Sequence, residues 1–436
     1  MTAKLKTSPD ERSSRSLPKG RWLVVALLFL FMLTNFADKA VIGIAGVPIM
    51  RELQLTPRQF GFVGSSFFFL FSLSAILTGF IVNRVQTRWV LLVMGLSWAL
   101  IQFPMLGSAG LGTIIACRVI LGAGEGPAWP VALHAAYKWF PNEQRTLATG
   151  VMALGGTTGI LIAPPLLNLI IVHFSWRWAF GALGITGLAW TTAWLLLGRE
   201  GPLGDAGEQK TAAASEYVPY RRLLLSPTIV ASWCAFFGAY WGLTLALTWL
   251  PVFFVKGLGF RQEDVGLLAA LPPALILIVE FTGGWYSKHL LVRGVSSRIA
   301  RGVLGGASVA GGGVALMLMP SLPATALKLV AITLGTALPT LIYVMVPAVV
   351  SEITPIAQRG ALLAIGNAIG TSAGLLAPYV MGSVVDTAAT PLDGFNTGFM
   401  LCGAIMLVGG LIGMTLMRPE REATWWGPAV LEQPVR

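Results

Sequence analysis

The stretch WLVVALLFLFMLTNFADKAVIGI, residues 22–44, decides the fold of this protein. It is long and apolar enough to cross a lipid bilayer as one helix, which takes about 20 residues. Asp38 and Lys39 nevertheless lie well inside the apolar run, although each charge costs roughly 2.5–3.5 kcal/mol at the centre of such a helix. A membrane span that keeps two opposite charges predicts that they are paired or face a wet cavity inside a helix bundle.

Eleven further apolar runs follow, so we expect an all-α membrane protein with twelve transmembrane helices. The expected spans are residues 22–44, 60–82, 89–108, 111–137, 146–171, 177–197, 228–255, 264–286, 299–319, 323–350, 360–385 and 394–417. The long break between the sixth and seventh has the composition of a linker. The predicted organisation is an N-tail at 1–21, a six-helix bundle at 22–197, a linker at 198–227, a second six-helix bundle at 228–417 and a C-tail at 418–436.

The composition excludes most other classes of protein. Hydrophobic residues make up 55% of the 436 and charged residues 11%, against about 25% charged in a soluble domain. The three cysteines and three histidines have no ligand spacing, so we expect no metal and no cofactor. No nucleophile, metal cluster or phosphate loop indicates an enzyme. The net charge of +11 does not imply nucleic acid, because basic loops beside a membrane explain it. The first apolar run is a full span rather than a cleavable signal peptide.

The distribution of basic residues predicts the orientation. With the N-terminus inside, the two tails and the inner loops hold 22 of the 30 lysines and arginines. Lysine and arginine accumulate on the cytoplasmic side of membrane proteins. We therefore expect both termini in the cytoplasm.

The two halves also resemble each other in sequence. Five positions recur at an offset of 214, namely Pro141, Arg145, Gly156, Ala163 and Pro164 as Pro355, Arg359, Gly370, Ala377 and Pro378. Parallel six-helix repeats are typical of rocking-bundle transporters, whose substrate site lies near the midplane between the halves.

Four charges in two spans carry the predicted chemistry. Arg118 and Glu125 are seven residues apart and so share one face of the fourth span, and Asp38 and Lys39 lie well inside the first span. They could form buried structural salt bridges, although such pairs contribute weakly to stability. Alternatively, Asp38 or Glu125 loads and releases a proton, while Arg118 and Lys39 bind an anion and compete for the acids.

Other polar or aromatic side chains are candidate functional residues, and each also has a purely structural interpretation. Asn35 lies one turn before Lys39 and either binds substrate or packs helices. Glu280, in the eighth span, is a possible second titrating group or a structural hydrogen-bonding residue. Four residues of the second half are candidates for the other wall of the substrate cavity, namely Tyr240, Trp241, Tyr343 and Asn367. Alternatively, they pack helices together or anchor the protein at the membrane interface.

Motifs spread along the chain resemble one known family, the anion:cation symporter family of the major facilitator superfamily. They are NFADK at 35–39, R-x6-E-G at 118–126, F-P-x-x-x-R at 140–145, SWRWAF at 175–180 and S-E-I-T-P-x-x-Q-R-G at 351–360. The resemblance implies two six-helix bundles, alternating access and a place in the bacterial inner membrane, working as a monomer. Similar bacterial members take up galactonate, hexuronates, glucarate or other carboxylates with protons. It further implies that Asp38 and Glu125 couple protons and that Arg118 links them to substrate.

The chain departs from this family at several positions. Lys39 stands where the family usually has arginine, which keeps the charge but loses the bidentate fork. Phe36 and Phe71 stand where sugar-acid members commonly carry tyrosine, and Asn83 and Gln86 depart from the usual signature of the loop between spans 2 and 3. A cavity stripped of hydroxyls suits a polyhydroxylated substrate poorly.

The resulting prediction is a transporter that imports an organic anion with protons, and favours an aromatic or short aliphatic carboxylate. Its partners are that anion, protons and membrane lipid. A sugar-acid symporter is the alternative if Phe36 and Phe71 face lipid or core. Anion efflux and uncoupled passage are further alternatives, because intramembrane acids argue for proton coupling without proving it.

Overall fold

The computed structural model describes residues 20–82, 84–140, 144–202 and 218–423, and every regular element within them is a helix. The predicted all-α fold is therefore confirmed. Asn83, Pro141, most of the expected N-tail, the middle of the expected linker and the end of the expected C-tail lie outside the described residues.

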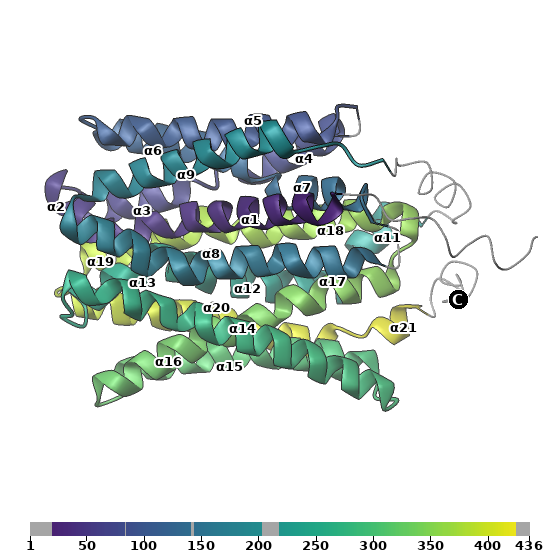
Figure 1. Ribbon diagram of the computed structural model, residues 1–436. Helices are drawn as coiled ribbons and strands as arrows, with labels where there is room; N and C mark the ends of the chain where they lie inside the picture. Colours follow the sequence, from purple (N-terminus) through teal and green to yellow (C-terminus); the bar gives the residue numbers. More distant parts are fainter. Residues whose placement is uncertain (1–19, 83, 141–143, 203–217, 424–436) are drawn as a thin grey trace, which may run out of the picture.

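Within the described residues the first half holds nine α-helices, shown in purple to teal in Figure 1. Their bounds are α1 (Arg21–Ile44), α2 (Gly46–Glu52), α3 (Pro57–Ser66), α4 (Phe71–Val82), α5 (Thr87–Gln102), α6 (Leu111–Glu125), α7 (Ala128–Tyr137), α8 (Arg145–His173) and α9 (Trp176–Leu197).

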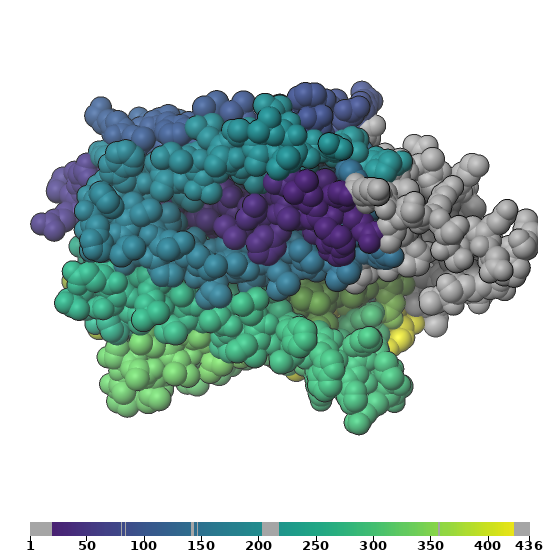
Figure 2. All heavy atoms as spheres, in the orientation of Figure 1, coloured from purple at the N-terminus to yellow at the C-terminus, as the bar shows by residue number. Residues whose placement is uncertain are grey.

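The second half continues from the described part of the linker segment, which includes the short helix α11. The bounds are α11 (Tyr220–Leu224), α12 (Pro227–Thr248), α13 (Leu250–Lys256), α14 (Gln262–Val292), α15 (Leu304–Leu318), α16 (Thr325–Ala337), α17 (Leu341–Ile353), α18 (Ile356–Thr371), α19 (Ala373–Thr387), α20 (Pro391–Leu416) and α21 (Pro419–Ala423). Figure 2 shows this half, in green, against the first half along the length of the molecule.

Eleven segments of the described chain are long and apolar enough to cross a membrane. The span expected at 111–137 is not among them; it consists of two shorter helices separated by Gly126 and Pro127, as the spans expected at 60–82, 228–255 and 360–385 also consist of two helices. Proline lacks an amide hydrogen and its ring clashes with the preceding turn, so a continuous helix stops there. The second half breaks its tenth expected span at Pro339, the position onto which Glu125 falls at the offset of 214. The repeat in sequence is thus also a repeat in backbone shape.

We call the end of the bundle where α1 begins and α21 lies the termini end (Figure 1). At this end each half has a glutamate that accepts a hydrogen bond from the first backbone amides of another helix. Glu200, just after α9, accepts hydrogen bonds from the first amides of α5, at Thr87 and Arg88, and pairs with Lys138 at 2.7 Å. Partial burial raises the pKa of Glu200, but these hydrogen bonds outweigh it and the net pKa is lowered. Glu420, just after α20, accepts from the amide of Arg298 at the matching place.

The two halves meet most closely at the opposite end, which we call the distal end. There α3 packs against α19, and α8 packs against α14. Arg58 donates to the Tyr379 hydroxyl at 2.8 Å, and Asn168 donates to the Gln262 carbonyl at 2.9 Å. Gln262 also donates to the Ile44 carbonyl at 3.2 Å. By contrast, α7 and α17, which lie toward the termini end, pack within their own halves.

Glycine makes this close approach possible. Gly61 of α3 lies directly against the main chain at Pro378, and Gly43 of α1 lies against the main chain at Leu247. A Cβ atom at either position would collide with a backbone carbonyl of the other half. Small residues at helix contacts let two backbones pack tightly in a membrane.

We predict that Gly61→Leu separates the halves at the distal end. The reporter is Ser65→Cys in a background without the native cysteines, because the Ser65 hydroxyl accepts from the Tyr379 amide at this contact. Its labelling by a maleimide should speed up several-fold. Gly79→Leu, where an added Cβ has no atom within 4 Å, is the matched control and should change nothing. Equal labelling in both variants contradicts the prediction.

Candidate functional site

The four charges predicted from the sequence come together inside the first half. Lys39 of α1 reaches across to Glu125 of α6, with 2.6 Å between Lys39 Nζ and Glu125 Oε2. The glutamate side chain is fully buried and that of lysine is 10% exposed. Lys39 also donates to Oδ1 of Asn35, one turn earlier, at 2.6 Å. The break after Glu125 ends α6 at this contact, so backbone shape places the carboxylate.

The side chains of Asp38 and Arg118 do not form an ion pair like that of Lys39 and Glu125. Asp38 is buried and its Oδ1 accepts a hydrogen bond from the Gln102 amide at 2.9 Å. Arg118 is also buried, and its Nη1 is 3.5 Å from the main-chain oxygen of Asp38. Within the described residues Arg118 has no carboxylate within 4 Å, and its buried Nε has no hydrogen-bond partner. Because buried donors are normally satisfied, this guanidinium is available for an anion.

Phenylalanine rings surround the two cations. The Lys39 ammonium lies 4.9 Å from the centre of the Phe36 ring, 5.8 Å from that of Phe67 and 5.9 Å from that of Phe71. The Arg118 guanidinium lies 4.6 Å from the Phe67 ring. Aromatic faces attract cations, so these rings hold the charges without offering a hydroxyl. Phe36 and Phe71 therefore face the charge cluster.

Two aromatic residues of the second half come near this cluster. Tyr240 of α12 lies against Phe68 of the first half, with ring centres 5.9 Å apart, and interacts electrostatically with Glu125. Tyr343 of α17 lies 6.4 Å from Tyr240, measured between ring centres. Tyr240 is therefore the nearer of the two tyrosines to the charges.

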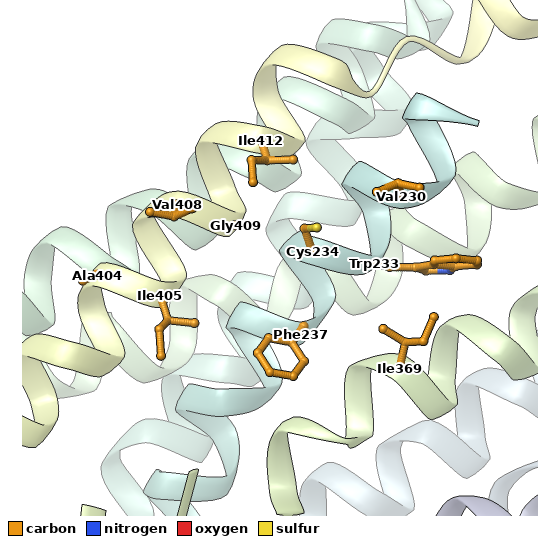
Figure 3. Close-up of a pocket in the computed structure, with 10 residues that line it drawn as sticks. All are labelled: Val230, Trp233, Cys234, Phe237, Ile369, Ala404, Ile405, Val408, Gly409 and Ile412. Carbon is orange, nitrogen blue, oxygen red and sulfur yellow. The ribbon is translucent and has the colours of Figure 1, made fainter. Parts of the chain in front are cut away.

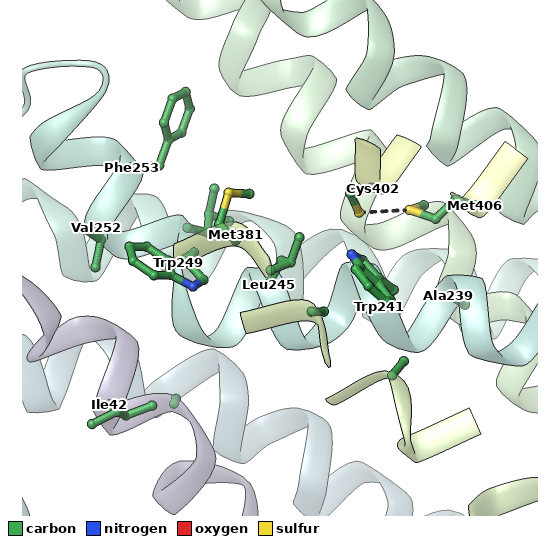
Figure 4. Close-up of a cluster of buried hydrophobic side chains, with 14 of the residues drawn as sticks. Ile42, Ala239, Trp241, Leu245, Trp249, Val252, Phe253, Met381, Cys402 and Met406 are labelled. Atoms are coloured by element: carbon green, nitrogen blue, oxygen red, sulfur yellow. Dashed lines mark hydrogen bonds between the residues drawn. The ribbon is translucent and has the colours of Figure 1, made fainter. Parts of the chain in front are cut away.

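In the described part of the chain, three other predicted residues make no hydrogen bond, ion pair or ring contact with this cluster. Trp241 of α12 is buried, packs on Phe237 and belongs to a hydrophobic cluster that also includes Cys402 of α20 (Figure 4). Asn367 has an exposed side chain on α18. Glu280 of α14 is partly buried and interacts with the Thr340 side chain.

Sequence reasoning missed Gln102 and Phe67. A signal existed for Gln102, because it is an amide inside the apolar run expected at 89–108. Phe67 had none, because it is one of three consecutive phenylalanines and only packing distinguishes it from Phe69, which is 45% exposed.

An apolar hollow of about 560 Å³ lies outside this site, between α12, α18 and α20 (Figure 3). Its lining includes Trp233, Cys234, Phe237 and Ile405 and contains no ionisable side chain other than the thiol. An anion needs charged or hydrogen-bonding groups. The charge cluster, not this hollow, is the candidate substrate site.

Known proteins similar to this chain are membrane transporters. Residues 27–346 match the family described as the Major Facilitator Superfamily. The chain is 28% identical to the "Probable sulfoacetate transporter SauU" of Cupriavidus necator, over 93% of this chain and 97% of that one. It is 25% identical to the hexuronate transporter of Bacillus subtilis, over 92% and 96%. It is 28% identical to the chloroplastic sodium-dependent phosphate transport protein 1 of Arabidopsis thaliana, over 90% and 78%.

Solved structures share the fold. A bacterial homologue of the human lysosomal transporter Spinster superimposes with a TM-score of 0.77 and 18% identity, over 94% of this chain and 99% of that one. The D-xylose-proton symporter superimposes with a TM-score of 0.74 and 17% identity, over 93% and 99%.

We predict that Lys39→Ala lowers the free energy of unfolding by roughly 3–5 kcal/mol, because it leaves the Glu125 carboxylate buried without its partner. Adding Glu125→Gln removes the stranded charge and should restore much of the loss. Thermal unfolding of the purified protein in detergent measures both effects.

The matched control is Arg261→Ala. Arg261 pairs with Glu263 at 3.3 Å, but the two side chains are 77% and 57% exposed. Exposed pairs contribute about 0–1 kcal/mol. A similar loss for Arg261→Ala and Lys39→Ala would show that burial of the Lys39–Glu125 pair has no special importance.

Proposed function

Because this chain belongs to the Major Facilitator Superfamily, a family of membrane transporters, we propose that it carries a small organic anion across the membrane together with protons. The observation that carries the proposal is Arg118. It is a buried guanidinium with an unpaired Nε and no carboxylate within 4 Å among the described residues. Such a group favours a ligand that brings its own negative charge.

The charges around Arg118 support an anion rather than a cation. Glu125 already holds Lys39, and the carboxylate of Asp38 already holds the Gln102 amide. Arginine presents a planar fork that matches a carboxylate or a related oxyanion. Three relatives named above are described as transporters of sulfoacetate, hexuronate and phosphate, which are all anions.

The Lys39–Glu125 pair supports proton coupling. An anion that bridges Lys39 and Arg118 takes the lysine away from Glu125. The carboxylate then lies buried without a partner, and that state is costly unless a proton neutralises it. Substrate binding and proton binding therefore favour each other. Asp38, held by Gln102 beside Arg118, is the second acid of the mechanism.

The rings around the cations support a substrate with few hydroxyls. Phe36, Phe67 and Phe71 offer aromatic faces where a sugar acid needs hydrogen-bond partners. An aromatic or short aliphatic carboxylate fits this lining best. The relative described as a hexuronate transporter keeps a sugar acid as the second candidate.

The distribution of basic residues supports a cytoplasmic termini end. With that orientation, the close contacts of Gly61, Arg58 and Asn168 at the distal end close the path toward the outside. Alternating access then requires these contacts to open while contacts at the termini end form.

A thermal-shift screen tests the substrate class. We expect benzoate, sulfoacetate or another weakly hydroxylated anion to raise the unfolding temperature of the wild type, since a ligand at 100 times its Kd stabilises by about 2.7 kcal/mol. Arg118→Ala should abolish the shift and Arg118→Lys should keep part of it. The exposed Arg261→Ala is the control. If glucuronate is the one anion of the screen that raises the unfolding temperature, the preference for few hydroxyls is wrong. If the shift persists in Arg118→Ala, the proposed binding site is wrong.

Transport by proteoliposomes tests the coupling, with an anion from that screen. A pH gradient should drive uphill uptake by the wild type, and Asp38→Asn with Glu125→Gln should abolish it while exchange of labelled for unlabelled anion continues. Uptake driven by a sodium gradient instead would sink proton coupling in favour of sodium. Accumulation in neither gradient would indicate uncoupled passage, and outward accumulation under an inward pH gradient would indicate efflux by antiport.

A further inference from the structure

Glu280 is an acid of the second half placed deep within a helix. It lies in α14 with at least three helical turns on either side, whereas Glu352 and Asp386 are next to the last residues of their helices. An ionised carboxylate is costly at such a place, and acids inside membrane spans mark functional sites by default.

Opposite charges do not approach Glu280 from the elements packed around it. These elements are α1, α8, α13, α16, α17, η5 (Arg298–Val303) and η7 (Leu338–Thr340). Apart from the charge cluster on α1 and the phenol of Tyr343, their described ionisable side chains lie at or near helix ends, namely Arg21, Arg145, His173, Lys256, Arg298, Arg301, Lys328 and Glu352. The nearest hydroxyls come from η7 and α17, which pack against α14: Thr340 donates to the Ala337 carbonyl at 2.8 Å, and Tyr343 lies on the following helix.

The Tyr343 hydroxyl gives the second observation. Its oxygen is buried and has no hydrogen-bond partner among the described residues. The ring is fixed by Phe236, 5.0 Å away between ring centres, so the hydroxyl is held in place rather than free to turn to water. Buried hydroxyls are nearly always hydrogen-bonded. A protonated carboxyl beside it supplies both a donor and an acceptor.

The same phenol lies on a line of contacts that leads to the charge cluster. Tyr343 is next to Tyr240, and Tyr240 interacts with both Phe68 and the carboxylate of Glu125 across the interface between the halves. Tyr240 therefore lies between the charge cluster and Tyr343. Movement of one half against the other alters the Tyr240 contact first.

We propose that Glu280 binds a proton in the second half and that Tyr343 is the positioning residue that orients the protonated carboxyl. Its part in transport rests on the proposed proton coupling at Asp38 and Glu125. A proton on Glu280 converts a carboxylate into a neutral acid that exchanges hydrogen bonds with Thr340 and Tyr343. Each transport cycle then moves one proton more than the first half alone accounts for.

Infrared difference spectroscopy of the full chain in liposomes tests the binding without any substrate. Between pH 5 and pH 9 the wild type should lose intensity in the carboxylic-acid C=O stretch as protons leave. Glu280→Gln should remove one component of that band. Glu263→Gln, an exposed acid in the first turn of the same helix, is the control and should remove none above the hydrated-acid background. A Glu280→Gln spectrum identical to the wild type overturns the proposal.

Two further variants keep the test decisive if Glu280→Gln fails to fold. Tyr343→Phe and Thr340→Val both retain the acid but change its hydrogen bonding, so each should shift the frequency of the Glu280 component. Unshifted bands in both variants would show that the carboxyl has no protonated state held by these hydroxyls.

The outcome separates this inference from the proposed function. In the Asp38→Asn, Glu125→Gln variant the Glu280 component should persist although pH-driven uptake is lost. In coupled transport Glu280→Gln should lower the number of protons moved per anion by one, measured with a pH dye inside the vesicles. If Glu280→Gln moves as many protons per anion as the wild type and pH-driven uptake is normal, the proposed role of Glu280 is wrong and the proposed function stands. Absent uptake in the wild type with the band present would overturn the coupling alone.

Discussion

A charge inside an apolar helix bundle must find an opposite charge or water, and the Lys39–Glu125 pair is where this structure meets that constraint. The pair joins α1 to α6 at 2.6 Å, directly at the break that ends α6. Asn35 and three phenylalanine rings complete the surroundings of the ammonium. Among the described residues, Arg118 is then the buried cation of the cluster without a carboxylate within 4 Å, and we propose that it is the group that binds the anion.

The two halves repeat a scaffold but not its chemistry. Each half breaks its fourth helix at a proline, near Pro127 and at Pro339, and each ends with a glutamate that caps the amides of its third helix. Among the described residues, the acids and bases that lie together deep in apolar helices, Asp38, Lys39, Arg118 and Glu125, belong to the first half, whereas the ion pairs of the second half lie at or near helix ends. The second half offers the phenols of Tyr240 and Tyr343 and, behind them, Glu280. This asymmetry fits the proposal that the first half holds the charge of the substrate.

The fold class and the family were predictable because they depend on long-range averages of the sequence. Twelve apolar runs, a linker-like break and motifs spaced along the whole chain are insensitive to the position of any single side chain. The family match confirms the predicted fold class and superfamily. The span at 111–137 was expected as one helix and is two, although Gly126 and Pro127 were visible. Proline often only kinks a membrane helix, so its presence does not decide between a kink and a break.

The sequence by itself determined that this protein lies in a membrane as a helix bundle, and it singled out Asp38, Lys39, Arg118 and Glu125 as the candidate functional residues, because charges in apolar spans are costly wherever they point. Only the tertiary structure decided their partners. It paired Lys39 with Glu125, gave Asp38 to Gln102 and left Arg118 against Phe67. It also buried Trp241 in a hydrophobic cluster with residues of both halves and brought Tyr240 against Phe68 of the first half. These choices depend on how helices distant in sequence rotate and approach each other, and residue spacing along one helix carries no information about that.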